Sequence, residues 1–138
     1  MKVLSMAATI LALITLSAPP AFAHGDAPLD KQKGANGGQL RMAGSNIYEL
    51  VVAKDSNGEQ ENPVVVYVAD HDGVKIVTAG ATGTATLLAG KLKVTTVLKP
   101  DGDNRMKGLA KYVSSPDMKV VVSITLPSKQ PEQARFTP

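Results

Sequence analysis

Short runs of alternating apolar and β-branched residues, each ended by residues that favour turns, make up most of the chain after residue 38. The clearest run is Met118–Leu126, in which every second residue is apolar and which Pro127 ends. Such a period of two places alternate side chains on opposite faces of a strand. Seven to nine such runs at nearly regular spacing predict an all-β protein with a single antiparallel immunoglobulin-like β-sandwich. The chain has no Cys and no Trp, so the prediction concerns the architecture and not a true immunoglobulin domain.

One segment, Arg105–Val113, allows two interpretations. Its apolar residues Met106, Leu109 and Ala110 fall at helical spacing, and a helix here could be capped by Asp103. The glycine within the segment and the short length favour an irregular strand instead. The predicted strands are therefore 39–42, 47–54, 64–69, 74–77, 84–88, 91–98, 105–113, 118–126 and 132–136.

The segment from Pro63 to Gly83 is predicted to form a β-hairpin around which the rest of the chain is arranged. Val64–Ala69 is apolar on both alternating faces, which is typical of a strand that is covered on both sides. Turn-forming residues follow at 70–73, and Val74–Val77 is expected to return as the second strand. This places His71 at an exposed hairpin tip.

The N-terminal residues have the features of a secretory signal peptide, predicted to span residues 1–23. Lys2 precedes an apolar run, Val3–Leu16, and Ala21-Phe22-Ala23 fits cleavage just before His24. The run is short for a membrane span, so we expect a periplasmic product with no stable membrane insertion after cleavage. Residues 24–38 mix Gly, Pro and charge and are predicted to form a flexible arm, followed by one domain at 39–138.

Composition and motifs argue against several classes of function. The absence of cysteine excludes a disulfide framework and a thiolate metal site. The chain carries 15 Lys and Arg against 12 Asp and Glu, interspersed along the sequence, which argues against a nucleic-acid partner. The chain has neither a G-x-S-x-G nucleophile motif nor a Cys nucleophile, so we do not expect an enzyme.

The candidate metal ligands are His24, His71, Asp70 and Asp72. Imidazole suits copper and zinc, and cleavage before His24 would add a free α-amine beside its imidazole. Copper is favoured over zinc for that amine–imidazole pair. Two other interpretations stay open. Residues 70–72 could serve only to form the turn, with His71 solvated, because turns are polar. Alternatively the aspartates could bind calcium, because hard cations are held by clustered carboxylates. Further oxygen ligands for calcium could come from Asp101 and Asp103. Thioether ligands for copper could come from Met42, Met106 and Met118.

Several short motifs resemble a family of small periplasmic β proteins linked to bacterial heavy-metal efflux systems, and also β domains attached to the periplasmic adaptor subunits of those pumps. The similarity extends over most of residues 24–138. A histidine often precedes the Gly-Gly pair in that family, whereas this chain has Asn36. The motifs are Asn36-Gly37-Gly38-Gln39-Leu40, Tyr48-Glu49-Leu50-Val51-Val52, Val66-Tyr67-Val68-Ala69-Asp70-His71-Asp72-Gly73, Ala79-Gly80-Ala81-Thr82-Gly83, Gly102-Asp103-Asn104 and Ala134-Arg135-Phe136.

The resemblance implies an accessory function in resistance to copper, zinc, cobalt or related metals. In the first hypothesis the protein binds such an ion and presents it to an efflux system. In the alternative, suggested by Asn36, it is a metal-free module that binds a periplasmic protein partner such as an efflux adaptor.

Overall fold

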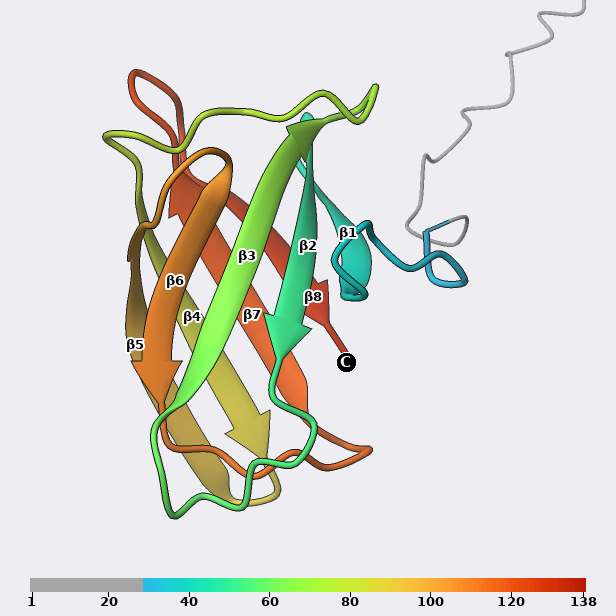
Figure 1. Ribbon diagram of the computed structural model, residues 1–138, viewed down its shortest axis with the longest axis vertical. Coiled ribbons are helices and arrows are strands. Elements are labelled where there is room, and N and C mark those ends of the chain that lie inside the picture. Colours follow the sequence, from blue (N-terminus) through green and yellow to red (C-terminus); the bar gives the residue numbers. More distant parts are fainter. Residues whose placement is uncertain (1–28) are drawn as a thin grey trace, which may run out of the picture.

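A computed structural model describes residues 29–138, and the fold of this part is all-β with no helix (Figure 1). The predicted signal peptide and His24 lie outside the described residues. No helix in the part that the structure describes is long and apolar enough to cross a membrane. The eight strands are β1 (Gln39–Ala43), β2 (Asn46–Val52), β3 (Asn62–Asp70), β4 (Thr82–Ala89), β5 (Leu92–Pro100), β6 (Arg105–Ala110), β7 (Lys119–Thr125) and β8 (Glu132–Phe136).

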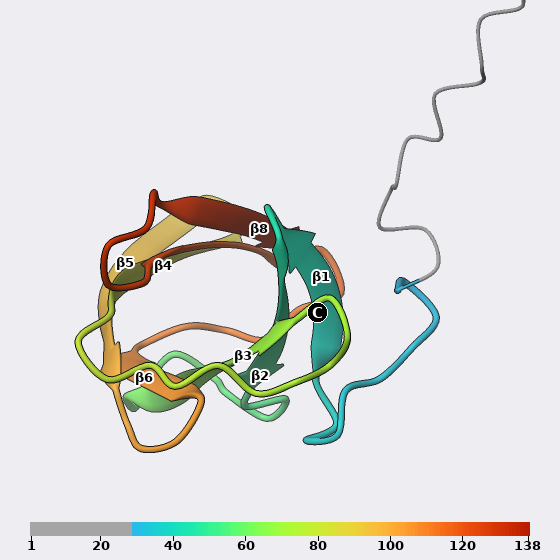
Figure 2. The same ribbon diagram turned by 90° about the horizontal axis from the view of Figure 1, so that it is seen from above.

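The strands form one nearly closed antiparallel sheet in the order β1-β2-β3-β6-β5-β4-β7-β8 (Figure 2). β5 and β6 pair over only two residue pairs, so the sheet behaves as two packed layers joined along this seam. When the strands after β1 are lettered along the chain, the layers are A-B-E and D-C-F-G, which is an immunoglobulin-like sandwich in which strand D pairs mainly with C instead of E. This confirms the predicted architecture. At the other side β1 contacts β8, and the side chain of Gln39 hydrogen-bonds the backbone of Thr137.

The core consists of the alternating inward residues of both layers. The predicted inward residues of β7 and β8, which include Val122 and Phe136, are all buried. Arg105–Ala110 is a strand, and its Met106 is fully buried in the core. Other large buried side chains are Tyr48, Leu50, Val64, Val66, Val68, Leu87, Leu98, Tyr112, Met118, Val120 and Ile124.

The predicted hairpin is only partly correct. The turn after β3 forms, with Gly73 at a φ of 80°, but Val74–Val77 is not a strand and makes a single bridge, between Ala69 and Lys75. β3 pairs with β2 over residues 64–70 and with β6 over residues 62–67, so β6 takes the edge of β3 along which a longer hairpin would have continued. Val74 and Val77 are 61% and 63% exposed.

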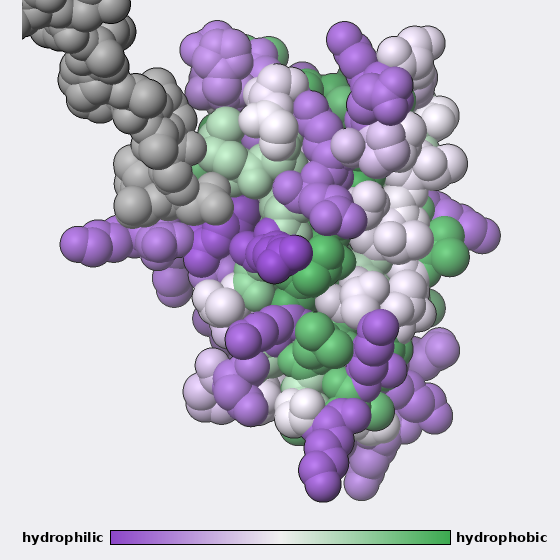
Figure 3. Space-filling view, turned by 180° about the vertical axis from the view of Figure 1, so that it is seen from behind, coloured by the Kyte–Doolittle hydropathy of each residue, from purple (hydrophilic) through white to green (hydrophobic). Residues whose placement is uncertain are grey.

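The outer face of the layer formed by β5, β4, β7 and β8 is weakly polar. Threonine and serine alternate outward on β4 and β7, and the space-filling view from behind shows near-white and green residues with purple ones among them and at the margins (Figure 3). Thr86 and Thr95 join β4 to β5 through a hydrogen bond of 3.1 Å between their hydroxyl groups. β-branched residues of this kind favour a pleated, half-exposed surface.

Val122→Asp should lower the free energy of unfolding by several kcal/mol, roughly the whole margin of a small domain, because it places an unpaired charge in the core. Ser123→Asp is the matched control, since Ser123 lies on the outer face of the same strand and should change stability by less than about 1 kcal/mol. Urea unfolding followed by circular dichroism measures both variants. Equal losses would contradict the assigned faces of β7.

Tyr112 links two loops at one end of the sandwich. Its buried hydroxyl donates to the carbonyl oxygen of Pro63 at 2.8 Å and accepts from the N–H of Ala53 at 2.9 Å. Burial raises the pKa of this hydroxyl. The folded state therefore keeps the Tyr112 proton to higher pH than the unfolded state does.

Tyr112→Phe should reduce the free energy of unfolding by about 1–3 kcal/mol, because both backbone groups lose their partner. The stabilisation from the raised pKa is complete below pH about 10 and declines above it, so the wild type should lose stability in this range more steeply than the variant. Urea titrations at pH 7 and at several values above 10 give the comparison. A Phe variant of unchanged stability at pH 7 would contradict the linking role.

Candidate functional site

A hollow of about 870 Å³ lies on the outer face of β1, β2, β3 and β6. One row of residues, opposite one another across these four strands, forms its floor: Leu40, Glu49, Tyr67 and Arg105. The turn after β3 and the turn before β6 form one rim, and residues 29–36 form another. The hollow therefore combines turn residues that are far apart in the sequence.

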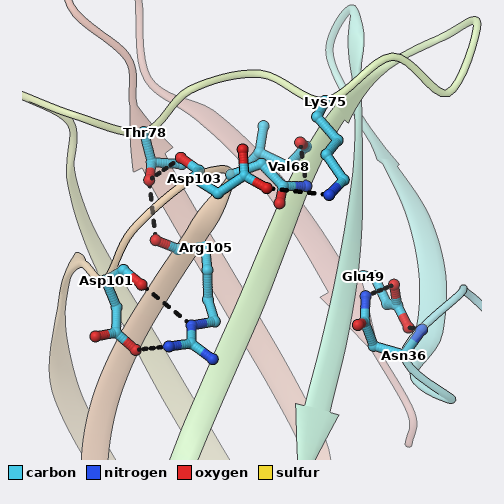
Figure 4. A network of polar contacts seen from close by, with 9 residues as sticks. Asn36, Glu49, Val68, Lys75, Thr78, Asp101, Asp103 and Arg105 are labelled. Atoms are coloured by element: carbon cyan, nitrogen blue, oxygen red, sulfur yellow. Dashed lines mark hydrogen bonds and ion pairs between the residues drawn. The ribbon is translucent and has the colours of Figure 1, made fainter.

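Glu49 is a buried carboxylate on this outer face. It accepts hydrogen bonds from the backbone N–H of Asn36 at 2.8 Å, from the Asn36 side-chain amide at 3.0 Å and from the N–H of Gly38 at 2.9 Å (Figure 4). The glycine at 34 permits this approach, because a Cβ there would overlap the carboxylate. The described part of the predicted arm is therefore folded over β2 and bonded to Glu49.

The turn after β3 holds three of the four predicted metal ligands. Asp70 has a structural task, since its Oδ1 accepts hydrogen bonds from the backbone N–H groups of Asp72 and Val74, both at 2.9 Å. His71 and Asp72 remain side by side, with 3.3 Å between Nε2 and Oδ2, and both side chains are 71% exposed. The turn therefore offers one imidazole and one carboxylate to the solvent at the rim of the hollow.

The other candidate ligands are not gathered at this turn. His24 lies outside the described residues, and Met106 and Met118 are buried in the core. Within residues 29–138, no group of three or more His, Asp or Glu side chains is arranged to hold a metal ion. A metal bound at His71 and Asp72 would therefore need additional ligands from elsewhere.

Asp101 and Asp103, which the sequence offered for calcium, each pair with a different cation (Figure 4). Asp101 Oδ2 lies 2.8 Å from Arg105 Nη2, and Asp103 Oδ2 lies 3.0 Å from Lys75 Nζ. The hydroxyl of the fully buried Thr78 donates a hydrogen bond to the carbonyl oxygen of Arg105 at 2.9 Å. This bond holds the segment around Thr78 against the start of β6. These pairs place balanced charges, rather than an acidic cluster, on the rim.

Sequence reasoning missed the role of Glu49. An acidic residue at an outward position among apolar neighbours, Tyr48 and Leu50, was the available signal, together with closely spaced glycines upstream. Neither feature identifies its partner, because Asn36 and Glu49 meet only when residues 34–38 fold over β2.

Comparisons with known proteins leave the family of this chain open. Neither a scan against protein-family models nor a search of curated proteins finds a match. The likeness to proteins of heavy-metal efflux systems therefore stays a prediction from short motifs.

Glu49→Ala should release the segment 34–38 from β2, because the N–H groups of Asn36 and Gly38 lose a charged acceptor. We expect their amide protons to exchange about tenfold faster or more, with little change for amides in β7. Hydrogen exchange followed by NMR measures both sets. Unchanged exchange at Asn36 and Gly38 would show that other contacts hold this segment.

Proposed function

We propose that this protein is an exported accessory protein of heavy-metal resistance, which binds one borderline divalent ion weakly and presents it to an efflux assembly. The observation that carries the proposal is the exposed pair formed by His71 and Asp72 at the rim of the hollow, with 3.3 Å between Nε2 and Oδ2. Imidazole is a preferred ligand of copper and zinc, and a neighbouring carboxylate adds a negative charge. Solvent-exposed ligands suit an ion that must be passed on.

Copper is the ion that we favour. Cleavage of the predicted signal peptide would leave His24 with an α-amine and an imidazole on the same residue. An α-amine has an unperturbed pKa of about 7.7 to 8.0, so a metal displaces its proton readily near neutral pH. These two nitrogens could complete the coordination begun by His71 and Asp72.

A second function is supported by a different observation. Four charged side chains of the hollow are already paired, Lys75 with Asp103 and Arg105 with Asp101, and the carboxylate of Glu49 is satisfied by amide groups. None of these groups needs an ion for stability. In this alternative the hollow is the docking surface of a metal-free module for a periplasmic protein such as an efflux adaptor.

Calorimetric titration of protein that starts at His24 distinguishes the two functions. We expect saturable binding of one cupric ion, tighter than that of zinc, and a loss of affinity of about tenfold or more in His71→Ala and in Asp72→Asn. Asp55→Asn removes an exposed charge elsewhere and is the matched control. Absence of saturable binding to either metal would contradict the metal function and leave the interaction module.

One extra residue placed before His24 tests the N-terminal chelate separately. It removes the α-amine from the imidazole-bearing residue and should weaken copper binding while leaving the fold unchanged. Equal affinity of the two proteins would exclude His24 as a chelate.

A further inference from the structure

Five lysines gather along the seam between β5 and β6. Lys93 and Lys99 are on β5, Lys107 is on β6, and Lys91 and Lys111 adjoin the ends of these strands. All five are exposed, and within residues 29–138 none of them lies within ion-pair distance of a carboxylate. The chain from 82 to 100 and from 104 to 116 contains no Asp or Glu. The seam therefore carries unbalanced positive charge.

The carboxylates around this surface lie at its ends. Asp101 and Asp103 follow β5 but are paired with Arg105 and Lys75. At the other end Glu61 precedes β3, whose Asn62 lies opposite Ala110, so the register places Glu61 near Lys111. The middle of the seam has no such neighbour.

Lys99 and Lys107 are directly opposite each other across the seam. Like charges in opposite positions of an antiparallel pair destabilise the pairing. Here they do so at a junction of only two residue pairs, where the nearly closed sheet has its shortest pairing. The fold gains nothing from this arrangement, which points to a partner that neutralises the charge.

Exposed aliphatic side chains lie among these lysines. Val97 is 61% exposed and Leu109 is 50% exposed. The hydroxyl of Thr96 donates to the carbonyl oxygen of Leu109 at 2.8 Å, and Gly108 lies against the carbonyl oxygen of Val97, so the two aliphatic residues belong to neighbouring parts of β5 and β6. We call Lys93, Val97, Lys99, Lys107 and Leu109 the basic seam (the left side of Figure 1).

We propose that the basic seam docks the protein on an anionic phospholipid surface. Clustered lysines are attracted to negatively charged headgroups, and aliphatic side chains among them can enter the interface. This surface function is independent of the metal site at His71 and Asp72.

The choice of cation favours lipid over an acidic protein. Arginine is the usual residue for fixed, bidentate pairing with carboxylates in protein interfaces, whereas lysine is a mobile point charge and is depleted there. In this protein two arginines, Arg41 and Arg105, make ion pairs with aspartates within the chain, whereas every charged side chain of the basic seam is a lysine. Mobile point charges suit a fluid layer of phosphate groups.

Co-sedimentation with vesicles tests the proposal on protein that starts at His24, which contains all eight strands. We expect binding to vesicles of equal parts phosphatidylglycerol and phosphatidylcholine and none to phosphatidylcholine alone. Raising the ionic strength from about 0.1 M to about 1 M shortens the Debye length from about 10 Å to about 3 Å and should release the protein. Absence of binding to the anionic vesicles, or equal binding to both kinds, would overturn the proposal.

Charge reversal locates the binding surface. Lys93→Glu combined with Lys107→Glu should weaken binding about tenfold or more. Lys54→Glu combined with Lys129→Glu changes the net charge equally at exposed positions elsewhere and should have a much smaller effect. Equal losses in the two double variants would show that net charge alone governs binding and would overturn the assignment to the seam.

Two further variants separate binding from folding. Lys107→Glu alone converts the like-charge pair with Lys99 into an opposite-charge pair, so it should weaken vesicle binding without lowering the unfolding midpoint in urea. At moderate salt, where the attraction of the lysines is screened, vesicle binding should depend more on the aliphatic side chains. Val97→Ser combined with Leu109→Ser should therefore weaken the binding that remains there. A dimer that forms through this face in solution, without vesicle binding, would assign the seam to a second copy of the chain and overturn the proposal.

Discussion

The burial of two apolar inner faces against each other is the interaction on which this structure depends. The chain has no disulfide, and strand pairing between the two layers is limited to two residue pairs, between β5 and β6. Side chains such as Val66 on β3 and Val122 on β7 therefore hold the layers together by removing apolar surface from water. Because this core orients every strand, it also decides which turns meet at the hollow.

Several carboxylates on the outside of the sandwich accept hydrogen bonds that hold neighbouring segments of the chain in place. Glu49 binds N–H groups of the segment before β1, Asp70 binds those of its own turn, and Glu132 accepts from the side chains of Ser45 and Asn46 at 3.2 Å and 2.6 Å. Backbone donors near the surface need acceptors, and charged acceptors make the stronger hydrogen bonds. This use of acidic residues explains why a chain with candidate ligands retains only one exposed His–Asp pair at its described turns.

Predictions from local pattern succeeded where the alternation within a single strand is enough to show which side chains face the core. The alternation in Met118–Leu126 identified the buried residues of β7, and the glycine in Arg105–Val113 correctly favoured a strand. They failed where two segments of the chain compete to pair with the same strand edge. Val74–Val77 has the residues of a strand, but β6 occupies the edge of β3 from residue 62 to residue 67, so the returning chain bonds β3 only at residues 68–70. For the site, the exposure of His71 was predictable, whereas the contact between Asn36 and Glu49 was not.

The sequence by itself determined the all-β class, the number of short strands to within one and the inward face of most of them, because alternation and turn residues act over a few neighbours. Only the tertiary structure decided the strand order, the folding of residues 34–38 over Glu49 and the alignment of Lys99 with Lys107. Along the sequence the lysines are interspersed among other residues, and they become one surface when β5 and β6 pair. Contacts between distant segments depend on which surfaces bury one another, and that competition involves the whole chain at once.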